Sequence, residues 1–594
     1  MFRLKRTVNC GDLKANYVGQ CVILNGWVEN RRDHGGLIFI DLRDRYGITQ
    51  VVFNPTKAAD SHNAAQALRS QHVIAVKGTV SRRPEGMYNP KLPTGEVEVF
   101  VEELEVINEA KTPPFEILDD INVQEELRLK YRYLDLRRHK MQENLRTRHK
   151  LIQIFREYFD RNEFIDVETP TMTRSTPGGA RNYLVPSRLF AGSFYGLSES
   201  PQLFKQLLMV SGYDRYFQVV KCFRDEDLRA DRQPEFTQFD LEMSFVDEDD
   251  VMNMIEGAVC EAFKRLKEVE LPRPFPRIPY AESMARFGVD KPDLRFGLEL
   301  VDVTEAVKGS GFKVFAETAA SGRSVKGLCA PGCGAYSRKE VDLLTTFVQG
   351  LGAKGLVSLK VEEAGLSGGV AKFLSPGEQA TLREKLKAQP GDLLLFVADK
   401  RSMADQALGQ LRNHLGEKLG LTKGGAFRLC WVVDFPMFEY SDEEKSIVAR
   451  HHPFTCPKPA HLDKLESAPL EVLARAYDLV LNGVELGGGS IRIHKMDLQK
   501  RVFRLLGITD EEARNKFSFL LDALDYGAPP MGGIALGVDR FVMLLLGLEH
   551  IRDVIAFPKT QKAMCLMTGA PAAVAERQLK DAHVRPVMTP EVKP

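Results

Sequence analysis

The chain has 594 residues, a length that predicts about three to five domains. Lys and Arg number 81, as do Asp and Glu, so the net charge is zero and any nucleic acid must bind through local basic patches. Apolar residues make up 44% of the chain, a share that excludes a collagen-like or largely disordered protein. The sequence shows neither a secretory signal nor an apolar run of about 18 residues, so we expect a cytoplasmic protein without a membrane span.

The first part of the chain has the pattern of a small barrel. Five runs rich in β-branched residues are separated by turn residues, and a helix-like stretch lies between the third and fourth; the runs are 22–24, 37–40, 48–53, 73–76 and 97–101. This order predicts an oligonucleotide-binding (OB) barrel. Arg31, Arg32, Phe39 and Gln50 offer cations, an aromatic ring and an amide for single-stranded bases. The alternative is a small barrel with a solvated basic turn.

The rest of the chain alternates helices with antiparallel-looking strands over about 150–290 and 425–565. Residues 290–420 are richer in Lys, Glu, Gly and Ala, which indicates an inserted α+β domain. Neither a P-loop nor a dinucleotide-binding glycine motif occurs. We therefore expect an α+β multidomain protein that binds any nucleotide in another way.

A helix is expected to start with Ser200 as its N-cap and Pro201 at its first position. Its buried apolar stripe is then expected to hold four residues, while Gln202, Lys205 and Gln206 share the other face; the stripe is Leu203, Phe204, Leu207 and Leu208. Lys205 in the first turn opposes the helix dipole, a cost that a bound carboxylate would reverse. The alternative is an ordinary solvated lysine.

A strand–turn–strand segment follows. In the returning strand the period of two places Gln238, Asp240 and Glu242 on one face, which is costly unless they hold a ligand or a cation. Arg224, at the end of the first strand, is placed to bind a phosphate. The alternative is a surface hairpin.

Asn482 and Gly483 predict a two-residue hairpin turn that pairs Val480 with Glu485. Asp478 then falls diagonally across from Glu485 on the same face, where two carboxylates can hold Mg²⁺ together with nucleotide phosphates. Arg492 could bind a carboxylate further along the strand. The alternative is a carboxylate pair on a wet sheet face.

Near the C-terminus a glycine-rich strand leads into an apolar helix with a single arginine, Arg540, in its first turn. Because an unpaired buried guanidinium is costly, Arg540 is expected to face a cavity that holds a phosphate or an aromatic ring.

Residues 164–170, 223–226 and 537–540 resemble motifs 1, 2 and 3 of the class II aminoacyl-tRNA synthetases. The stretches 131–138, 200–206, 223–242, 451–455 and 487–494 are similar to bacterial-type aspartyl-tRNA synthetases. The resemblance implies a homodimer and six segments: an OB-fold anticodon-binding domain (1–108), a hinge (109–135), the catalytic domain in two parts (136–289 and 423–564), an insertion domain between motifs 2 and 3 (290–422) and a C-terminal extension (565–594).

The resemblance also implies site roles, with ATP and L-aspartate as substrates. ATP would contact Arg224, Asp225, Glu226, Gln233, Glu485, Gly537, Val538, Asp539 and Arg540, of which Arg224 and Arg540 are the expected catalytic residues. Aspartate would contact Ser200, Gln202, Lys205, Arg224, Asp240, His451 and Arg492, with Asp478 and Glu485 holding Mg²⁺. The anticodon would contact Arg31, Arg32, His34, Phe39, Gln50 and Gly86.

Two departures from the family pattern bear on specificity. Gly178 replaces a glutamate that usually helps to hold the substrate ammonium, and Asn182 replaces an aspartate. His34 and Gly86 stand where relatives that charge only tRNA(Asp) commonly have leucine and lysine. Our hypothesis is therefore an enzyme that aspartylates both tRNA(Asp) and tRNA(Asn).

Three alternatives are considered. The first is an enzyme strictly specific for tRNA(Asp), and the second is a non-catalytic tRNA-binding paralogue, which the presence of Arg224, Glu485, Arg492 and Arg540 disfavours. The third is an asparagine- or lysine-specific relative. Two cations, Lys205 and Arg492, suit a dicarboxylate substrate better than either of those.

Overall fold

The computed structural model describes residues 2–175, 181–228 and 231–587. The chain divides into two compact units, one ending at Glu143 and the other beginning at Asn144. Among the described residues, no helix combines the length and the apolar character needed to cross a membrane.

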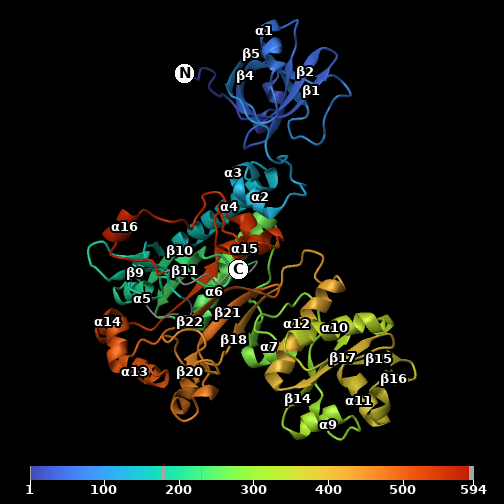
Figure 1. The fold of residues 1–594 in the computed structure, drawn as a ribbon, viewed down its shortest axis with the longest axis vertical. Helices are drawn as coiled ribbons and strands as arrows, with labels where there is room; N and C mark the ends of the chain where they lie inside the picture. The colour runs from blue at the N-terminus through green and yellow to red at the C-terminus, as the bar shows by residue number, and fades with distance from the viewer. Residues whose placement is uncertain (1, 176–180, 229–230, 588–594) are drawn as a thin grey trace. The chain divides into compact units, whose positions relative to one another are not determined.

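The first unit contains a closed five-stranded barrel with the strand order β1-β2-β3-β5-β4 (Figure 1). Its elements are β1 (Cys21–His34), β2 (Leu37–Arg43), β3 (Ile48–Phe53), α1 (Ala59–Ala65), β4 (Val73–Arg82) and β5 (Val97–Asn108). Ile38, Ile40 and Val51 point into the barrel core, as the period of two requires. The predicted OB barrel, with its helix between the third and fourth strands, is confirmed.

A buried ion cluster follows the barrel, around α2 (Glu125–Lys130) and α3 (Arg132–Asp135). The Asp135 carboxylate is fully buried and accepts hydrogen bonds from Arg132 Nη1 at 2.6 Å and from Arg138 Nη1 at 2.8 Å. The cluster joins these short helices to the start of α4 (His139–Arg161).

The second unit is built on a mainly antiparallel sheet of eight strands in the order β12-β18-β21-β22-β23-β11-β10-β6. The strands are β6 (Ile165–Asp166), β10 (Arg215–Phe223), β11 (Glu235–Ser244), β12 (Arg277–Pro279), β18 (Leu429–Val433), β21 (Ala476–Leu481), β22 (Val484–Ile491) and β23 (Met531–Gly537). Smaller sheets are formed by β7 (Met172–Thr173), β8 (Leu184–Pro186) and β9 (Phe194–Leu197), and by β19 (Phe438–Ser441) and β20 (Ser446–Ala449). The prediction of antiparallel strands in this part of the chain is confirmed.

Three helices of the second unit cover one face of this sheet. α4, α6 (Glu248–Lys267) and α15 (Val538–Leu546) pack on one face, where Phe155 of α4 stacks on Phe239 of β11 with ring centroids 4.2 Å apart. The other face carries the polar residues described below. The remaining helices outside the insertion are α5 (Gln202–Val210), α7 (Tyr280–Phe287), α13 (Met496–Leu505), α14 (Asp510–Asp525) and α16 (Glu576–Asp581).

The inserted segment forms its own three-layer domain. Its sheet has the order β13-β14-β17-β15-β16, with β13 (Val301–Asp302), β14 (Ser324–Ala330), β15 (Val357–Glu362), β16 (Gly365–Ser367) and β17 (Leu393–Asp399). In β17, Leu393 and Leu395 face one helix layer while Leu394 and Phe396 face the other. One layer holds α10 (Arg338–Gly350) and α12 (Arg401–Lys418); the other holds α8 (Thr304–Val307), α9 (Lys313–Ala320) and α11 (Pro376–Lys385) (Figure 1).

Two expectations for α5 are wrong. The helix starts at Gln202, with Pro201 at the N-cap position and no side-chain cap, so Ser200 does not cap it. Lys205 and Gln206 are buried, whereas Leu203 and Leu207 are only partly buried. The physical reason is that the polar face of α5 turns towards buried partners on β11, a contact that sequence periodicity alone does not show.

The Phe155–Phe239 stack gives a stability prediction. Phe155→Ala should lower the free energy of unfolding of the second unit by about 3–5 kcal/mol, because it removes a fully buried ring. Urea unfolding in a Trp27→Phe background would report it, since the chain has two tryptophans and only Trp431 lies in this core. Tyr526→Ala, at an 88% exposed position, is the control and should change stability by less than about 0.5 kcal/mol. Equal effects of the two changes would contradict the assignment.

Candidate active site

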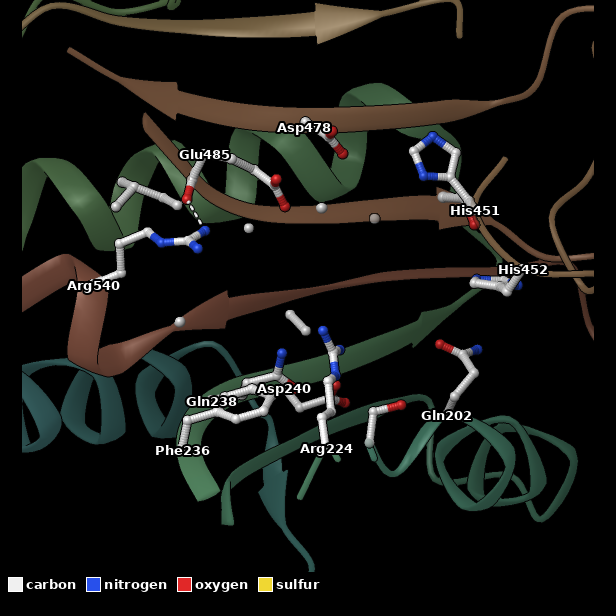
Figure 2. A pocket seen from close by; sticks show the side chains of 18 of the residues that line it. Gln202, Arg224, Phe236, Gln238, Asp240, His451, His452, Asp478, Glu485 and Arg540 are labelled. Carbon is white, nitrogen blue, oxygen red and sulfur yellow. Dashed lines mark hydrogen bonds between the residues drawn. The ribbon is translucent and has the colours of Figure 1, made fainter. Parts of the chain in front are cut away.

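A cavity of about 560 Å³ opens on the polar face of the eight-stranded sheet. Asp478 and Glu485 lie on one side of it and Arg224 and Asp240 on the other (Figure 2). Most residues predicted from the sequence line it together: Ser200, Gln202, Lys205, Arg224, Glu226, Gln233, Asp240, His451, Asp478, Glu485, Arg492, Gly537, Asp539 and Arg540.

Three predicted residues do not line the described cavity. Asp225 is exposed and pairs with Arg181 through a backbone bridge, and Val538 packs in the apolar core beneath the sheet. Gly178 lies outside the described residues. Asp539 does reach the cavity wall, but its carboxylate binds Arg148 of α4 and the backbone N–H of Thr237, so it joins α15 to α4 and β11.

The floor of the cavity holds a buried cluster of four charges, Lys205, Asp240, Glu242 and Arg492. Lys205 Nζ lies 3.1 and 3.2 Å from the two oxygens of Asp240 and 3.3 Å from Glu242 Oε2. It also donates to the carbonyl oxygen of Leu241 at 3.4 Å. Buried charges are tolerated when they are paired in this way.

Arg492 completes the cluster. Its guanidinium donates to both oxygens of Glu242, at 2.9 and 3.1 Å, and Nη1 lies 2.7 Å from Ser490 Oγ and 2.8 Å from His452 Nε2. Glu242 fits here because Gly533 stands opposite it on β23, where a Cβ atom would lie 2.1 Å from Glu242 Oε2. Both cations of the cluster are therefore held by carboxylates before any substrate arrives.

Burial shifts the titration of the groups around this cluster. It raises the pKa of Asp240 to about 6, although Lys205 opposes the shift. It lowers the pKa of His451 to about 4 and that of His452 well below its usual range, with Arg450 and Arg492 adding to the respective effects. Both histidines are therefore neutral at pH 7.

Arg224 is placed to bind an anion. Its guanidinium stacks over the Phe236 ring at 5.1 Å, and its buried Nε has no hydrogen-bond partner among the described residues. An unpaired buried donor is costly, and a phosphate or carboxylate oxygen in the cavity would remove that cost.

Arg540 reaches the cavity from the first turn of α15, as predicted. Nη1 donates to the backbone oxygen of Glu485 at 2.7 Å, and Nη2 forms an ion pair with Asp231 at 3.0 Å. Together with Arg224 it places guanidinium groups at two points of the same cavity.

The hairpin that carries Asp478 and Glu485 differs from the predicted register. Val480 pairs with Glu485 as expected, but a bulge between Leu479 and Val480 brings Asp478 opposite Gly488. Such a bulge inserts one residue into a strand and re-aims the side chains beyond it, which pairing rules from the turn do not show. The two carboxylates then converge over Gly488, where a Cβ atom would lie 2.4 Å from Asp478 Oδ1 and 3.9 Å from Glu485 Oε1.

This geometry fits a Mg²⁺ ion. Burial, and then the neighbouring Glu485, raise the pKa of Asp478 well above its usual range, and a divalent cation would relieve that repulsion. Among the described residues no group of three or more His, Cys, Asp or Glu side chains is arranged as a metal cage. Two carboxylates are what Mg²⁺ takes when nucleotide phosphates and water supply its other ligands.

The segment after motif 2 is held by a contact that the sequence does not show. Gln233 donates from Nε2 to the Lys559 backbone oxygen at 3.0 Å and accepts from the Lys559 N–H at 2.8 Å. Lys559 also pairs with Glu235, and Glu226 pairs with Arg232 at 3.0 Å.

Asn182 is not part of the cavity lining. Its amide nitrogen donates to Glu199 Oε1 at 2.9 Å, and its oxygen accepts from Ser175 Oγ at 3.0 Å. Asn182 is therefore part of a local network, and it adds no charge to replace the usual aspartate.

In the first unit, the predicted base-contacting residues are only partly brought together. Arg32 lies opposite Phe39, and its guanidinium contacts Gln50 Oε1 at 3.3 Å on the outer face of the barrel. Arg31 points elsewhere, donating to the Ala65 backbone oxygen at 3.3 Å. His34 is exposed at the end of β1, and Gly86 has a φ of +79° with open space around it.

Sequence reasoning missed several polar residues. Gln50 Nε2 donates to Glu98 Oε2 at 2.8 Å, and burial raises the pKa of Glu98. The signal for Glu98 was a charged residue between two buried valines of β5. His452 and Asp231 gave no such signal, because they meet Arg492 and Arg540 only through the fold.

Comparisons with known proteins show which families the chain matches. The family model described as tRNA synthetases class II (D, K and N) matches residues 124–561, and the OB-fold nucleic acid binding domain matches residues 22–107. The chain is 56% identical to the Aspartate--tRNA(Asp/Asn) ligase of Syntrophotalea carbinolica over 98% of both chains. It is also 56% identical to the protein of the same name from Symbiobacterium thermophilum, over 98% of this chain and 100% of that one.

Solved structures share the fold at lower identity. Asparaginyl-tRNA synthetase from Pyrococcus horikoshii, complexed with asparaginyl-adenylate, aligns with a TM-score of 0.59 at 22% identity and covers 94% of this chain and 99% of its own. The Entamoeba histolytica enzyme in complex with asparaginyl-adenylate gives 0.59 at 19% identity, over 93% of this chain and 98% of its own. These matches bear on the fold alone.

The convergence of carboxylates over Gly488 gives a prediction. Gly488→Ala should weaken binding of Mg²⁺-ATP about tenfold or more, because the new methyl group must displace Asp478 Oδ1. Isothermal titration calorimetry at several Mg²⁺ concentrations would measure it. Gly350→Ala, where a Cβ atom has open space, is the matched control. Unchanged binding by the Gly488 variant would show that this pair holds no ion.

Proposed function

Since the chain belongs to the class II tRNA synthetases of the D, K and N group, we propose that it is an aminoacyl-tRNA ligase that attaches L-aspartate to tRNA. The reaction uses ATP and passes through an aspartyl-adenylate. The observation that carries the choice of amino acid is the pair of buried cations, Lys205 and Arg492, on the floor of the cavity.

The side-chain carboxylate of aspartate binds next to these two cations. Lysine and arginine have only donors, so they suit an oxygen at every position of the substrate side chain. The amide nitrogen of asparagine would place a further donor against them. This argument disfavours the asparagine-specific alternative. A lysine-specific enzyme is disfavoured because the substrate side chain would add a third cation.

The substrate ammonium binds Asp240. Asp240 Oδ1 is buried and accepts no hydrogen bond of good geometry from the described residues, although Lys205 Nζ lies 3.1 Å away. Gln202 and Ser200 line the same side of the cavity and supply neutral oxygens. Asp240 therefore takes over a role that Gly178 cannot fill.

Adenylate formation needs no nucleophile from the protein. The α-carboxylate of aspartate attacks the α-phosphorus of ATP, and pyrophosphate leaves. Arg224 neutralises charge at the α-phosphate, and Arg540 exchanges its contact with Asp231 for the outer phosphates. Asp478 and Glu485 would hold Mg²⁺, which supplies positive charge to the phosphates when bound. Catalysis rests mainly on positioning.

The terminal ribose of the tRNA then attacks the carbonyl carbon of the adenylate, and AMP leaves. The barrel face around Arg32, Phe39 and Gln50 binds the anticodon. We infer that both tRNA(Asp) and tRNA(Asn) are accepted, because His34 is exposed and Gly86 has open space around it. The names of the relatives support the same inference.

The enzyme acts as a homodimer in the cytoplasm, where tRNA and ATP are available. Support for the dimer comes from β6, the last strand in the described order of the eight-stranded sheet, whose Ile165 is 48% exposed. Met172 and Leu184 of the small sheet that follows are also exposed. Apolar side chains at a strand edge favour pairing with another chain.

The aspartate pocket is tested by Lys205→Met, which keeps the length of the side chain and removes its charge. We expect the KM for aspartate in pyrophosphate exchange to rise about 100-fold or more, because the variant leaves Asp240 without its cation and removes one of the two cations beside Glu242. The dissociation constant for ATP should change little. Lys221→Met, an exposed lysine on β10, is the control and should behave as the wild type. An unchanged KM for aspartate in the Lys205 variant would contradict the assignment of the aspartate pocket.

Asp240 gives a pH prediction. Its pKa of about 6 means that the carboxylate is ionised at pH 7 and gains a proton as the pH falls through 6. The substrate ammonium then loses its acceptor, so the KM for aspartate should rise as the pH is lowered from 7 to 5 while the KM for ATP stays nearly constant. Pyrophosphate exchange across this range measures both. A flat aspartate profile would contradict the role given to Asp240.

Relaxed tRNA specificity is tested by charging transcripts of tRNA(Asp) and tRNA(Asn) with radiolabelled aspartate. We expect both to be aspartylated, and His34→Leu combined with Gly86→Lys to reduce charging of tRNA(Asn) more than that of tRNA(Asp). Absence of Asp-tRNA(Asn) from the wild type would establish a strictly tRNA(Asp)-specific enzyme. Absence of both products, with normal tRNA binding, would identify a non-catalytic paralogue.

A further inference from the structure

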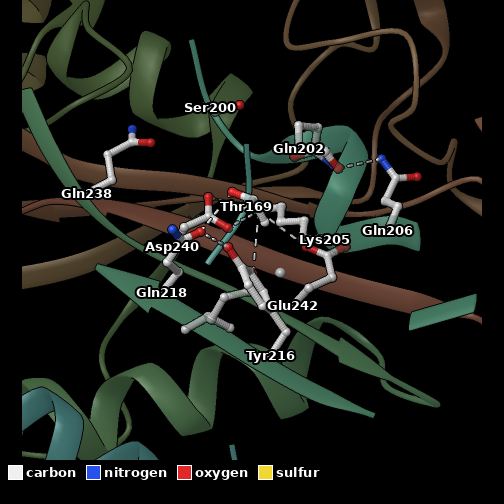
Figure 3. A network of polar contacts seen from close by, with 12 residues as sticks. Thr169, Ser200, Gln202, Lys205, Gln206, Tyr216, Gln218, Gln238, Asp240 and Glu242 are labelled. Atoms are coloured by element: carbon white, nitrogen blue, oxygen red, sulfur yellow. Dashed lines mark hydrogen bonds and ion pairs between the residues drawn. The ribbon is translucent and has the colours of Figure 1, made fainter. Parts of the chain in front are cut away.

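Behind the aspartate pocket lies a second, largely buried polar network that the reaction does not itself use. It consists of Thr169, which follows the motif 1 strand β6, and of Tyr216 and Gln218 on β10 (Figure 3). We propose that Gln218, fixed by the Thr169 and Tyr216 hydroxyls, is a positioning residue that orients Asp240 for the substrate ammonium. This inference rests on the proposed function.

The contacts fix the Gln218 amide at its oxygen end. Thr169 Oγ1 donates to Gln218 Oε1 at 2.9 Å, and the Tyr216 hydroxyl donates to the same oxygen at 2.8 Å. Both Tyr216 and Gln218 are buried, and burial raises the pKa of the Tyr216 hydroxyl far above its usual range, so it remains a donor. An amide oxygen that accepts two hydrogen bonds leaves the NH₂ group to face the other side.

The strand register places this network against the ion cluster. Gln218 pairs directly with Asp240, and Tyr216 pairs directly with Glu242, in the antiparallel ladder of β10 and β11. Side chains that are directly opposed in such a ladder share a face and lie about 4.5–5.5 Å apart at Cβ. Figure 3 shows the Gln218 amide next to the Asp240 carboxylate.

A fixed amide at this position has a specific consequence. On one side of Asp240, Lys205 of α5 attracts the carboxylate. On the other side, the Gln218 side chain of β10 limits the rotation of the same carboxylate. Asp240 can then present Oδ1 to the cavity. The network should matter for a substrate with an ammonium group and much less for one that has only the two carboxylates.

The network also ties the pocket to motif 1. The Val167 N–H donates to the Phe217 backbone oxygen at 3.2 Å, which extends the pairing of β6 with β10 to two residues before Thr169. Among the described contacts, the hydrogen bond from the Thr169 hydroxyl is the one side-chain contact that links the motif 1 segment to Gln218.

The test compares L-aspartate with succinate, which keeps both carboxylates and lacks the ammonium. Tyr216→Phe, Thr169→Val and Gln218→Met each remove one element of the network with little change in volume. We expect each to raise the KM for aspartate in pyrophosphate exchange by about three- to tenfold, with kcat, the KM for ATP and the inhibition constant of succinate changed less than about twofold.

Two further variants sharpen the comparison. Gln218→Glu keeps the oxygen that accepts from both hydroxyls but turns a second oxygen towards Asp240, so its KM for aspartate should exceed that of Gln218→Met. Thr169→Val should add nothing in the Gln218→Met background, because both act through the same oxygen. Ser244→Ala, a buried hydroxyl at the far end of β11, is the matched control and should leave all constants unchanged.

The outcomes separate the possibilities. A parallel rise of the aspartate KM and the succinate inhibition constant would show that the network only shapes the pocket, and no rise in any variant would show that it has no role; either result overturns the inference. If the Gln218 variants do not fold, Tyr216→Phe and Thr169→Val decide the question alone. A wild type without aspartate-dependent exchange would overturn the proposed function, and this inference with it.

Discussion

The structure depends on the pairing of four buried charges at the floor of one cavity. Lys205 and Arg492 are each held by carboxylates of β11, at distances between 2.9 and 3.3 Å. The cluster has no net charge, so it can stay buried without a ligand, and its cations still attract an incoming carboxylate. Removing any one member would leave an uncompensated charge in the protein interior, which costs more than the loss of a surface pair.

The fold explains how these charges are held. The helices α4, α6 and α15 cover one face of the eight-stranded sheet, so alternate residues of β11 point to the apolar core and to the opposite face, which carries the site. Phe239 and Leu241 face the helices, whereas Asp240 and Glu242 lie on the opposite face, where Asp240 lines the cavity and Glu242 is fully buried beside Lys205 and Arg492. Glycines of β22 and β23 then let carboxylates approach the sheet closely, as Gly488 does for Asp478 and Gly533 for Glu242.

Much of this could be predicted from the sequence, because it depends on local patterns. The five strands of the barrel follow from alternation, and Lys205, Asp240, Arg492 and Arg540 follow from polar residues on otherwise apolar elements. The bulge beside Val480 could not be predicted, since the turn alone sets a regular register. Nor could the pairing of Arg492 with Glu242, which joins residues 250 positions apart.

The most direct test of the account is the ratio of kcat/KM for L-aspartate and L-asparagine in pyrophosphate exchange by the wild-type protein. Because Lys205 and Arg492 have only hydrogen-bond donors, they should favour aspartate over asparagine by about 10³-fold or more in kcat/KM. Comparable activation of the two amino acids would contradict it, because a neutral amide would then satisfy the cluster as well as a carboxylate does.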